Sequence, residues 1–264
     1  MADELYTHGH HQVVVNAHAT RTVVDSAQFL LPRLESSLRL LDFGCGPGSI
    51  TAGLAGHVAT VVGVDSSPEA IGIARRDAAA PNVEYLVASV YDLPLPDDSF
   101  DVAYAHQVLQ HLGDPTAALS EVRRVLVPGG LVAVRDADFG SMIHHPHYQE
   151  LDVWLDIYHQ VARGNGGEPD AGRRLAGWVR RAGYENITAT SSSWHYTTPE
   201  QRLWWARLWA DRIRLPRFSN RAADLGLADA IGPIAAAWLH WAAEPDGWFA
   251  FVHGEVIASK PERA

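Results

Sequence analysis

Short apolar runs alternate with helix-like stretches between residues 38 and 135 of the chain. Five of these runs are bounded by turn-forming residues, which is typical of buried parallel strands. The predicted strands cover residues 38–43, 58–64, 83–87, 100–105 and 131–134. The stretches between them repeat apolar residues every three or four positions, which indicates helices. Helices are expected over 49–57, from Pro68 to about residue 78, around 106–112 and over 116–126.

This alternation predicts an α/β fold: a Rossmann-like parallel sheet with helices on both faces and right-handed crossovers. After residue 140 the alternation stops, and two long helical patterns follow, over 147–163 and 199–242. The apolar runs 187–196 and 248–259 are predicted to be the sixth and seventh strands. We therefore expect a seven-stranded, mostly parallel sheet whose last strand is antiparallel. The inserted helices are expected to form a lid over a ligand site at the carboxyl ends of the strands.

The chain of 264 residues is interpreted as one domain. A helical pattern runs from residue 13 to 34, so residues 1–37 are expected to be an N-terminal lid and helix. The binding core is expected over 38–140, the helical lid with the sixth strand over 141–247, and the last strand over 248–259.

Composition narrows the classes of function. The net charge is −10 and basic residues form no stripe, which argues against a nucleic-acid partner. No apolar stretch is long enough for a membrane span, and the first residues lack the apolar region of a secretory signal. The one cysteine, Cys45, allows no intrachain disulfide, which fits a reducing compartment. We expect a soluble, cytoplasmic protein and leave a homodimer open.

A glycine-rich turn follows the first predicted strand. The strand ends at Asp42, and Gly44, Gly46 and Gly48 come next, before a predicted helix. Glycine lets the backbone approach a ligand closely, and a helix start offers free N–H groups. Asp65 ends the next strand, where a carboxylate accepts hydrogen bonds from ribose hydroxyls. No P-loop motif is present. A nicotinamide or flavin site and a turn without ligand remain as alternatives.

Four ordered motifs resemble class I S-adenosylmethionine (SAM)-dependent methyltransferases. They are the segments 40–48 (LLDFGCGPG), 62–67 (VGVDSS), 92–101 (DLPLPDDSFD) and 126–130 (LVPGG). The combination is most similar to the small-molecule branch that includes ubiquinone- and menaquinone-biosynthesis methyltransferases. The resemblance implies a SAM-dependent methyltransferase with a small-molecule acceptor.

The resemblance also implies roles for individual residues. The backbones of Gly44, Cys45 and Gly46 would face the methionine and ribose, Asp42 would lie near the amino group, and Asp65 would hold both ribose hydroxyls. Ser66 would pack beside the adenine. Many relatives have an aspartate that accepts from the adenine amine at the position of Ser89. In this chain the Ser89 hydroxyl or the Val90 N–H would contact the adenine instead. Side chains expected at the methionine end or over the cofactor are those of Tyr6, Arg21, His106 and Gln107.

A general base helps if the methyl acceptor is a hydroxyl. His111 is the first candidate because it follows the fourth strand, and Asp138 is the second because it follows the fifth. Each of the other histidines, including His195 and His253, is interpreted first as a structural or surface residue. The sequence 144–147 (HHPH) is too slight a basis for a metal site, so no metal is expected.

All nine tryptophans lie after residue 150. They indicate ordinary helix packing or an aromatic wall around an apolar or planar acceptor. The leading hypothesis is methyl transfer from SAM to a small, apolar or aromatic acceptor, on oxygen, nitrogen or carbon. The alternatives are a SAM-binding cyclase or isomerase on the same fold, and a non-catalytic SAM-binding module.

Overall fold

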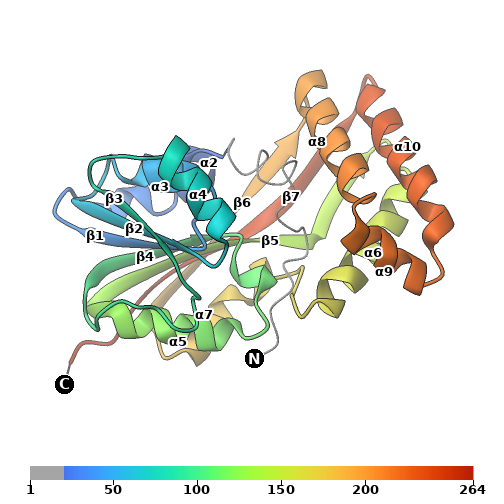
Figure 1. The fold of residues 1–264 in the computed structure, drawn as a ribbon. Helices are drawn as coiled ribbons and strands as arrows, with labels where there is room; N and C mark the ends of the chain where they lie inside the picture. Colours follow the sequence, from blue (N-terminus) through green and yellow to red (C-terminus); the bar gives the residue numbers. More distant parts are fainter. Residues whose placement is uncertain (1–20, 264) are drawn as a thin grey trace.

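The computed structural model describes residues 21–263 and shows one seven-stranded sheet covered by helices (Figure 1). The strand order is β3-β2-β1-β4-β5-β7-β6, and β7 runs antiparallel to both of its neighbours. The strands are β1 (Arg39–Phe43), β2 (Thr60–Asp65), β3 (Val83–Val87), β4 (Phe100–His106), β5 (Leu126–His145), β6 (Glu185–Tyr196) and β7 (Trp248–Ser259). The expected sheet, with its single antiparallel strand, is confirmed.

Helices cover both faces of the first five strands (Figure 1). One face carries α2 (Val23–Ala27), α3 (Ser49–Leu54) and α4 (Pro68–Asp77), and the other carries α5 (Pro115–Val125) and α7 (Leu175–Arg181). Leu40, Val61 and Tyr104 pack under α2 and α3, whereas Leu41 and Val64 belong to the cluster under α5 and α7. Strand residues therefore alternate between two apolar layers, as the continuous apolar runs require.

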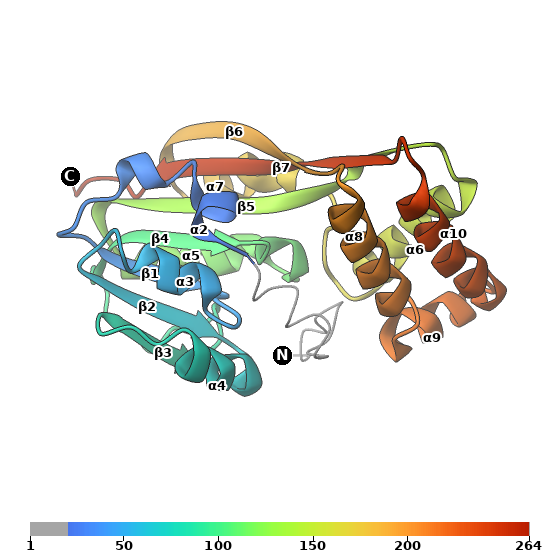
Figure 2. The same ribbon diagram turned by 90° about the horizontal axis from the view of Figure 1, so that it is seen from above.

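Strands β5, β6 and β7 continue beyond β1–β4 towards a separate group of helices (Figure 2). The group contains α6 (Gln149–Gly164), α8 (Pro199–Arg212), α9 (Pro216–Asp224) and α10 (Ile231–Ala243). Its core is aromatic, with Trp154 in edge contact with both Trp209 and Trp238. No helix in the described part of the chain is both long and apolar enough to cross a bilayer.

Several expectations about the elements were wrong in extent. Of the helix expected around 106–112, only a single 3-10 turn at Leu109–His111 is formed. The helix expected over 199–242 is divided, because Pro216 cannot continue α8 and Gly226 turns the chain at a φ of 73°. In the described part, the helix expected over 13–34 ends at Ala27. Strand β5 runs to His145 instead of residue 134, because its polar second half is paired with β7, out to His145 opposite Trp248.

Candidate functional site

The glycine turn joins β1 to α3 and is fastened to β2. Gly44, Gly46 and Gly48 all have positive φ, which favours glycine. The N–H groups of Gly44 and Cys45 donate to the Val64 carbonyl over 2.7 and 3.0 Å. At Gly46 no described atom lies within 4 Å of the place where a Cβ would be. The turn is therefore fixed on one side and presents bare backbone to open space on the other.

Asp65 connects this turn to the start of α4. Its carboxylate accepts from the Gly46 N–H and from the Ser67 N–H, each over 2.9 Å. The side chain is half-buried, and a carboxylate has more acceptor positions than these two bonds use. Asp65 can therefore hold the turn and also accept from the hydroxyls of a ribose.

Asp42 lies below the turn in a buried position. Its Oδ2 accepts from the Thr51 hydroxyl over 2.6 Å. The pKa of Asp42 is raised to about 7, mainly by burial; the Thr51 hydrogen bond opposes this rise and the nearby charge of Asp65 adds to it. A cationic group beside Asp42 would favour the charged carboxylate, as expected for a partner of an amino group.

The other residues expected around the cofactor lie in the turn itself or shortly after β2 and β3. The Cys45 thiol is buried, and burial raises its pKa well above the ordinary value, so the thiol stays protonated. Ser66 is exposed and Val90 is half-buried. The Ser89 hydroxyl accepts from the Tyr91 N–H over 3.2 Å and still has a second lone pair. Tyr6 lies outside the described residues.

These features fit an adenosyl cofactor. A side chain at Gly46 would occupy the open space beside the turn, and the Asp65 carboxylate borders that space. Gly44, Cys45, Gly46 and Asp65 would hold the adenosyl and methionine parts, because these positions combine open backbone with a hydrogen-bond acceptor.

A cavity of about 380 Å³ lies between the carboxyl ends of the strands and α8. Aromatic side chains form much of its wall: Phe139, Trp194, Tyr196, Trp204, Trp205, Trp209 and Phe251. Gln107, which follows β4, also lines it, and the next residue, Val108, lies against Gly44. The glycine turn and the cavity therefore adjoin at residues 107–108.

Gln107 has a φ of 55°, which is unusual for a residue other than glycine and is often found at functional sites. Its Oε1 accepts from Arg21 over 2.6 Å, and its Nε2 lies 2.8 Å from the His253 Nε2. Because the Gln107 amide nitrogen is a donor, His253 accepts at Nε2. The expected position of Gln107 near the reacting end is thus compatible with the structure.

His106 differs from Gln107, because its side chain lies in the sheet and not in the cavity wall. Its Nδ1 lies 3.4 Å from an Arg135 nitrogen, and its ring is 5.6 Å from that of Trp194. Arg135 in turn forms a buried ion pair with Glu255 over 3.2 Å. These residues are cross-strand neighbours on β4, β5 and β7. We therefore assign His106 to the support of the wall.

His111 lines the cavity, but its pKa is too low for it to act as an effective base. Its Nε2 lies 3.0 Å from the Gln110 amide nitrogen. The pKa of His111 is lowered to about 3, mainly by burial and in part by the charges of Arg21 and Arg212. The ring is therefore neutral at neutral pH and has little affinity for a proton.

Asp138 does not point into the cavity, which corrects the expectation that it is a base. The cavity is lined by its neighbours Ala137 and Phe139, and strand residues alternate in direction. The Asp138 carboxylate binds Arg173 through two bonds, to Nε over 2.6 Å and to Nη2 over 2.5 Å. Asp138 therefore fastens the segment at Arg173 to β5.

The sequence interpretation missed Arg212 and Gln110 in the wall. Arg212 is buried and its guanidinium lies 5.3 Å from the centre of the Trp209 ring. The sequence does carry a signal for Arg212. Its spacing from Trp205 and Trp209, by seven and three residues, places all three side chains on one face of a helix. The spacing does not show what this face contacts. Only the positions of the neighbouring strands in the fold show that it lines a cavity.

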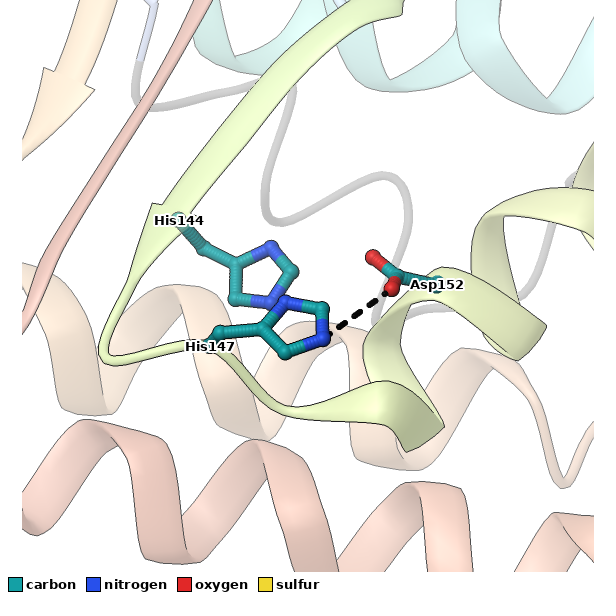
Figure 3. Close-up of side chains that lie close together, drawn as sticks. All are labelled: His144, His147 and Asp152. Carbon is teal, nitrogen blue, oxygen red and sulfur yellow. Dashed lines mark ion pairs between the residues drawn. The ribbon is translucent and has the colours of Figure 1, made fainter.

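His144 and His147 form a small group with Asp152, and none of the three lines the cavity (Figure 3). His147 Nε2 lies 3.5 Å from the Asp152 carboxylate, and His144 Nε2 accepts from the Tyr148 N–H over 3.1 Å. A neutral His144 that accepts at Nε2 has its proton on Nδ1, so neither nitrogen has a lone pair for a cation. The bond to His144 holds the backbone at Tyr148, directly before α6 begins.

The chain is similar to known methyltransferases. A family model described as "Methyltransferase domain" matches residues 41–134. The chain is 34% identical over 279 residues to an uncharacterized methyltransferase of Schizosaccharomyces pombe, covering 98% of both proteins. It is 39% identical over 97 residues to a ubiquinone biosynthesis O-methyltransferase of Cereibacter sphaeroides, covering 36% of this chain and 39% of that protein.

A solved structure of phosphoethanolamine N-methyltransferase 2 from Haemonchus contortus, in complex with SAM, shares the fold. It has a TM-score of 0.56 and 20% identity, covering 89% of this chain and 52% of that chain. The resemblance in sequence extends over the full length of one relative, and the glycine turn is formed as the family motif requires. The chain therefore belongs to the class I methyltransferases, which use SAM as cofactor.

Proposed function

We propose that the protein transfers the methyl group of SAM to a small, planar, apolar or aromatic molecule bound in the cavity. The observation that carries this proposal is the junction at residues 107–108, where Val108 contacts the glycine turn and Gln107 lines the cavity. Bound SAM supplies an electrophilic methyl group, so the main task of the protein is to place the acceptor in line with it.

The chain's own residues divide this task. The turn at Gly44–Gly46 and the carboxylates of Asp42 and Asp65 hold the cofactor, with Ser66, Ser89 and Val90 beside the adenine. The aromatic wall excludes water and orients a flat acceptor. In this proposal His111 contacts the acceptor as a neutral ring, because its lowered pKa does not suit a base. The net charge of −10 supports small molecules rather than nucleic acid as substrates, and we place the reaction in the cytoplasm.

Two measurements test this function. Calorimetry should show binding of SAM and of its demethylated product. Incubation with methyl-labelled SAM and a panel of flat aromatic phenols, acids and amines should then move the label into at least one product. Absence of SAM binding would refute the proposal. A product that forms only with SAM but carries no label would favour a cyclase or isomerase instead.

A further inference from the structure

Gln107, at the junction of the glycine turn and the cavity, is held by three other segments of the chain. Its backbone N–H donates to the Arg135 carbonyl of β5 over 2.7 Å. Its side-chain oxygen accepts from Arg21 over 2.6 Å, and its side-chain nitrogen lies 2.8 Å from the His253 Nε2 on β7. A backbone φ of 55° persists only where the surroundings fix the residue in this way.

Arg21 decides which way the Gln107 carboxamide faces. A guanidinium group donates hydrogen bonds and accepts none, so the oxygen of the carboxamide has to lie towards Arg21. The amide nitrogen then lies towards His253 and donates to its Nε2. A neutral imidazole that accepts at Nε2 carries its proton on Nδ1. The three side chains therefore specify one tautomer of His253.

His253 lies directly behind the aromatic wall of the cavity. It is fully buried on β7, between Ala137 of β5 and Ser192 of β6. Its ring centre is 4.5 Å from that of Trp194 and 4.8 Å from that of Phe251, and both of these rings line the cavity. His253 itself does not line the cavity, so it affects the cavity only through its neighbours.

The bond to Gln107 alone sets the state of the His253 ring. Burial holds the pKa of His253 well below its ordinary value, and the charges of Arg135 and Arg21 contribute in the same direction, so the ring is neutral. Its Nδ1 has no hydrogen-bond partner among the described residues. A buried N–H without an acceptor costs free energy, so the ring keeps this tautomer for the sake of the bond at Nε2.

The other end of the chain of bonds holds an edge of the cavity. Arg21 and Asp25, at the start of α2, both line the cavity. The bond from Arg21 to Gln107 and a bond of 3.2 Å from the Trp194 Nε1 to the Asp25 carbonyl fasten this segment to the wall. The position of the segment therefore depends on the direction of the Gln107 carboxamide.

We propose that His253 is a positioning residue for methyl transfer: by accepting from the Gln107 amide, it fixes Gln107 at the junction and, through Gln107, holds Arg21 at the edge of the cavity. This role rests on the proposed function, because that function places the reacting groups at the junction. The tautomer of His253 does not depend on it and can be tested separately.

The first test measures the tautomer of His253 by nitrogen-15 NMR of the full chain with labelled histidine. Protonated and unprotonated ring nitrogens have distinct chemical shifts, and the His253 signals are those that are missing in His253→Gln. At neutral pH we expect a proton on Nδ1 and none on Nε2. A proton on Nε2 would overturn the inference and would leave the methyltransferase function intact.

The second test compares His253→Phe, which keeps a planar ring and removes the acceptor, with His253→Gln, whose side-chain oxygen can take the place of Nε2. Label transfer from SAM is measured with 2-naphthol and with the other phenols, acids and amines of the panel. We expect His253→Phe to lower kcat by about tenfold or more and His253→Gln to retain most of the rate. In a Gln107→Met background, His253→Phe should change kcat by less than about twofold, because the residue through which it acts is gone.

His240→Phe is the matched control, because His240 is exposed on α10 and does not line the cavity. It should leave kcat unchanged. A structural role of His253 would give the same loss of kcat with and without Gln107, and that result would overturn the inference, as would a full rate in His253→Phe. No SAM binding and no label in any product of the wild type would refute the proposed function itself, so the two failures are distinguishable.

Discussion

Gly44 and Val108 fit together so closely that a Cβ on Gly44 would overlap the Val108 side chain. This contact joins the glycine turn to the segment after β4. Gly44 also has a φ of 75°, so a substitution there meets both strain and overlap. The fit explains why the turn and the cavity keep a fixed relation to each other.

Gly44→Ala should therefore destabilise the fold by about 2–4 kcal/mol and weaken SAM binding. Denaturant unfolding and calorimetry measure the two effects. Adding Val108→Ala should restore part of the stability, because it removes the overlap and not the strain. Gly72→Ala is the control: it lies in α4 with no described atom within 4 Å of its Cβ, and should stabilise by about 1 kcal/mol. A Gly44 variant as stable as the wild type would contradict the packing described.

Asp65→Ala should weaken SAM binding by about 1–3 kcal/mol, the scale of buried polar groups that lose a partner. The variant removes the acceptor of the Gly46 and Ser67 N–H groups along with the acceptor for the ribose. Calorimetry with SAM gives the difference directly. Asp246→Ala, at an exposed position, is the control. Unchanged affinity in Asp65→Ala would sink the assignment of this carboxylate to the cofactor.

The raised pKa of Asp42 makes a prediction about stability and pH. The ordinary pKa of the carboxyl is 3.8 and its pKa in the folded protein is about 7. The folded state therefore favours the protonated carboxyl, and this group's contribution to the free energy of unfolding is complete below pH 3.8. That contribution is lost as the pH rises towards 7. Between pH 5 and 8 it should fall by about 2–3 kcal/mol.

Asp42→Asn retains an acceptor for Thr51 but cannot ionise, so its melting temperature should exceed that of the wild type more at pH 8 than at pH 5. Asp136 is also buried with a pKa raised to about 7, and it remains in both proteins as an internal reference. The same variant should bind SAM more weakly if Asp42 faces the amino group. A stability difference that is the same at both pH values would show that Asp42 is not protonated in the fold.

Asp138 and Arg173 should affect stability and not the chemical step. Arg173→Met leaves a buried carboxylate without its partner, whereas Asp138→Asn leaves an arginine that is more than half exposed. We therefore expect a loss of about 2–4 kcal/mol for Arg173→Met and about 1–2 kcal/mol for Asp138→Asn. Both folded variants should retain kcat. A fall in kcat of about 10²-fold or more in Asp138→Asn alone would instead indicate a base.

Trp204 and Trp248 form a matched pair, because each is 39% exposed and only Trp204 lines the cavity. Trp204→Ala should raise the KM for an aromatic acceptor several-fold, since stacking on an aromatic ring contributes about 0.5–1.5 kcal/mol. Trp248→Ala should leave KM unchanged. The affinity for SAM should be the same in both. Equal effects of the two substitutions on KM would place the acceptor elsewhere.

The sequence by itself determined the sheet and the glycine turn that we propose as the cofactor cradle. Each of the first five strands is a local apolar run followed by turn-forming residues, and the cradle residues lie within a few positions of a strand end. Glycines with positive φ and a carboxylate at a strand tip are local requirements, so they can be recognised without knowing what packs against them.

Only the tertiary structure decided the cavity that we propose as the acceptor site. The wall combines Arg21, Gln107, Trp194 and Arg212, which come from four separate segments, and no local pattern indicates that they meet. The same holds for Asp138, whose direction on β5 depends on how far the strand continues beside β7. The lowered pKa of His111 likewise depends on its burial and on two arginines that are distant in sequence. Long-range packing sets the charge of the cavity, because electrostatic energy depends on distances between side chains and not on their separation in sequence.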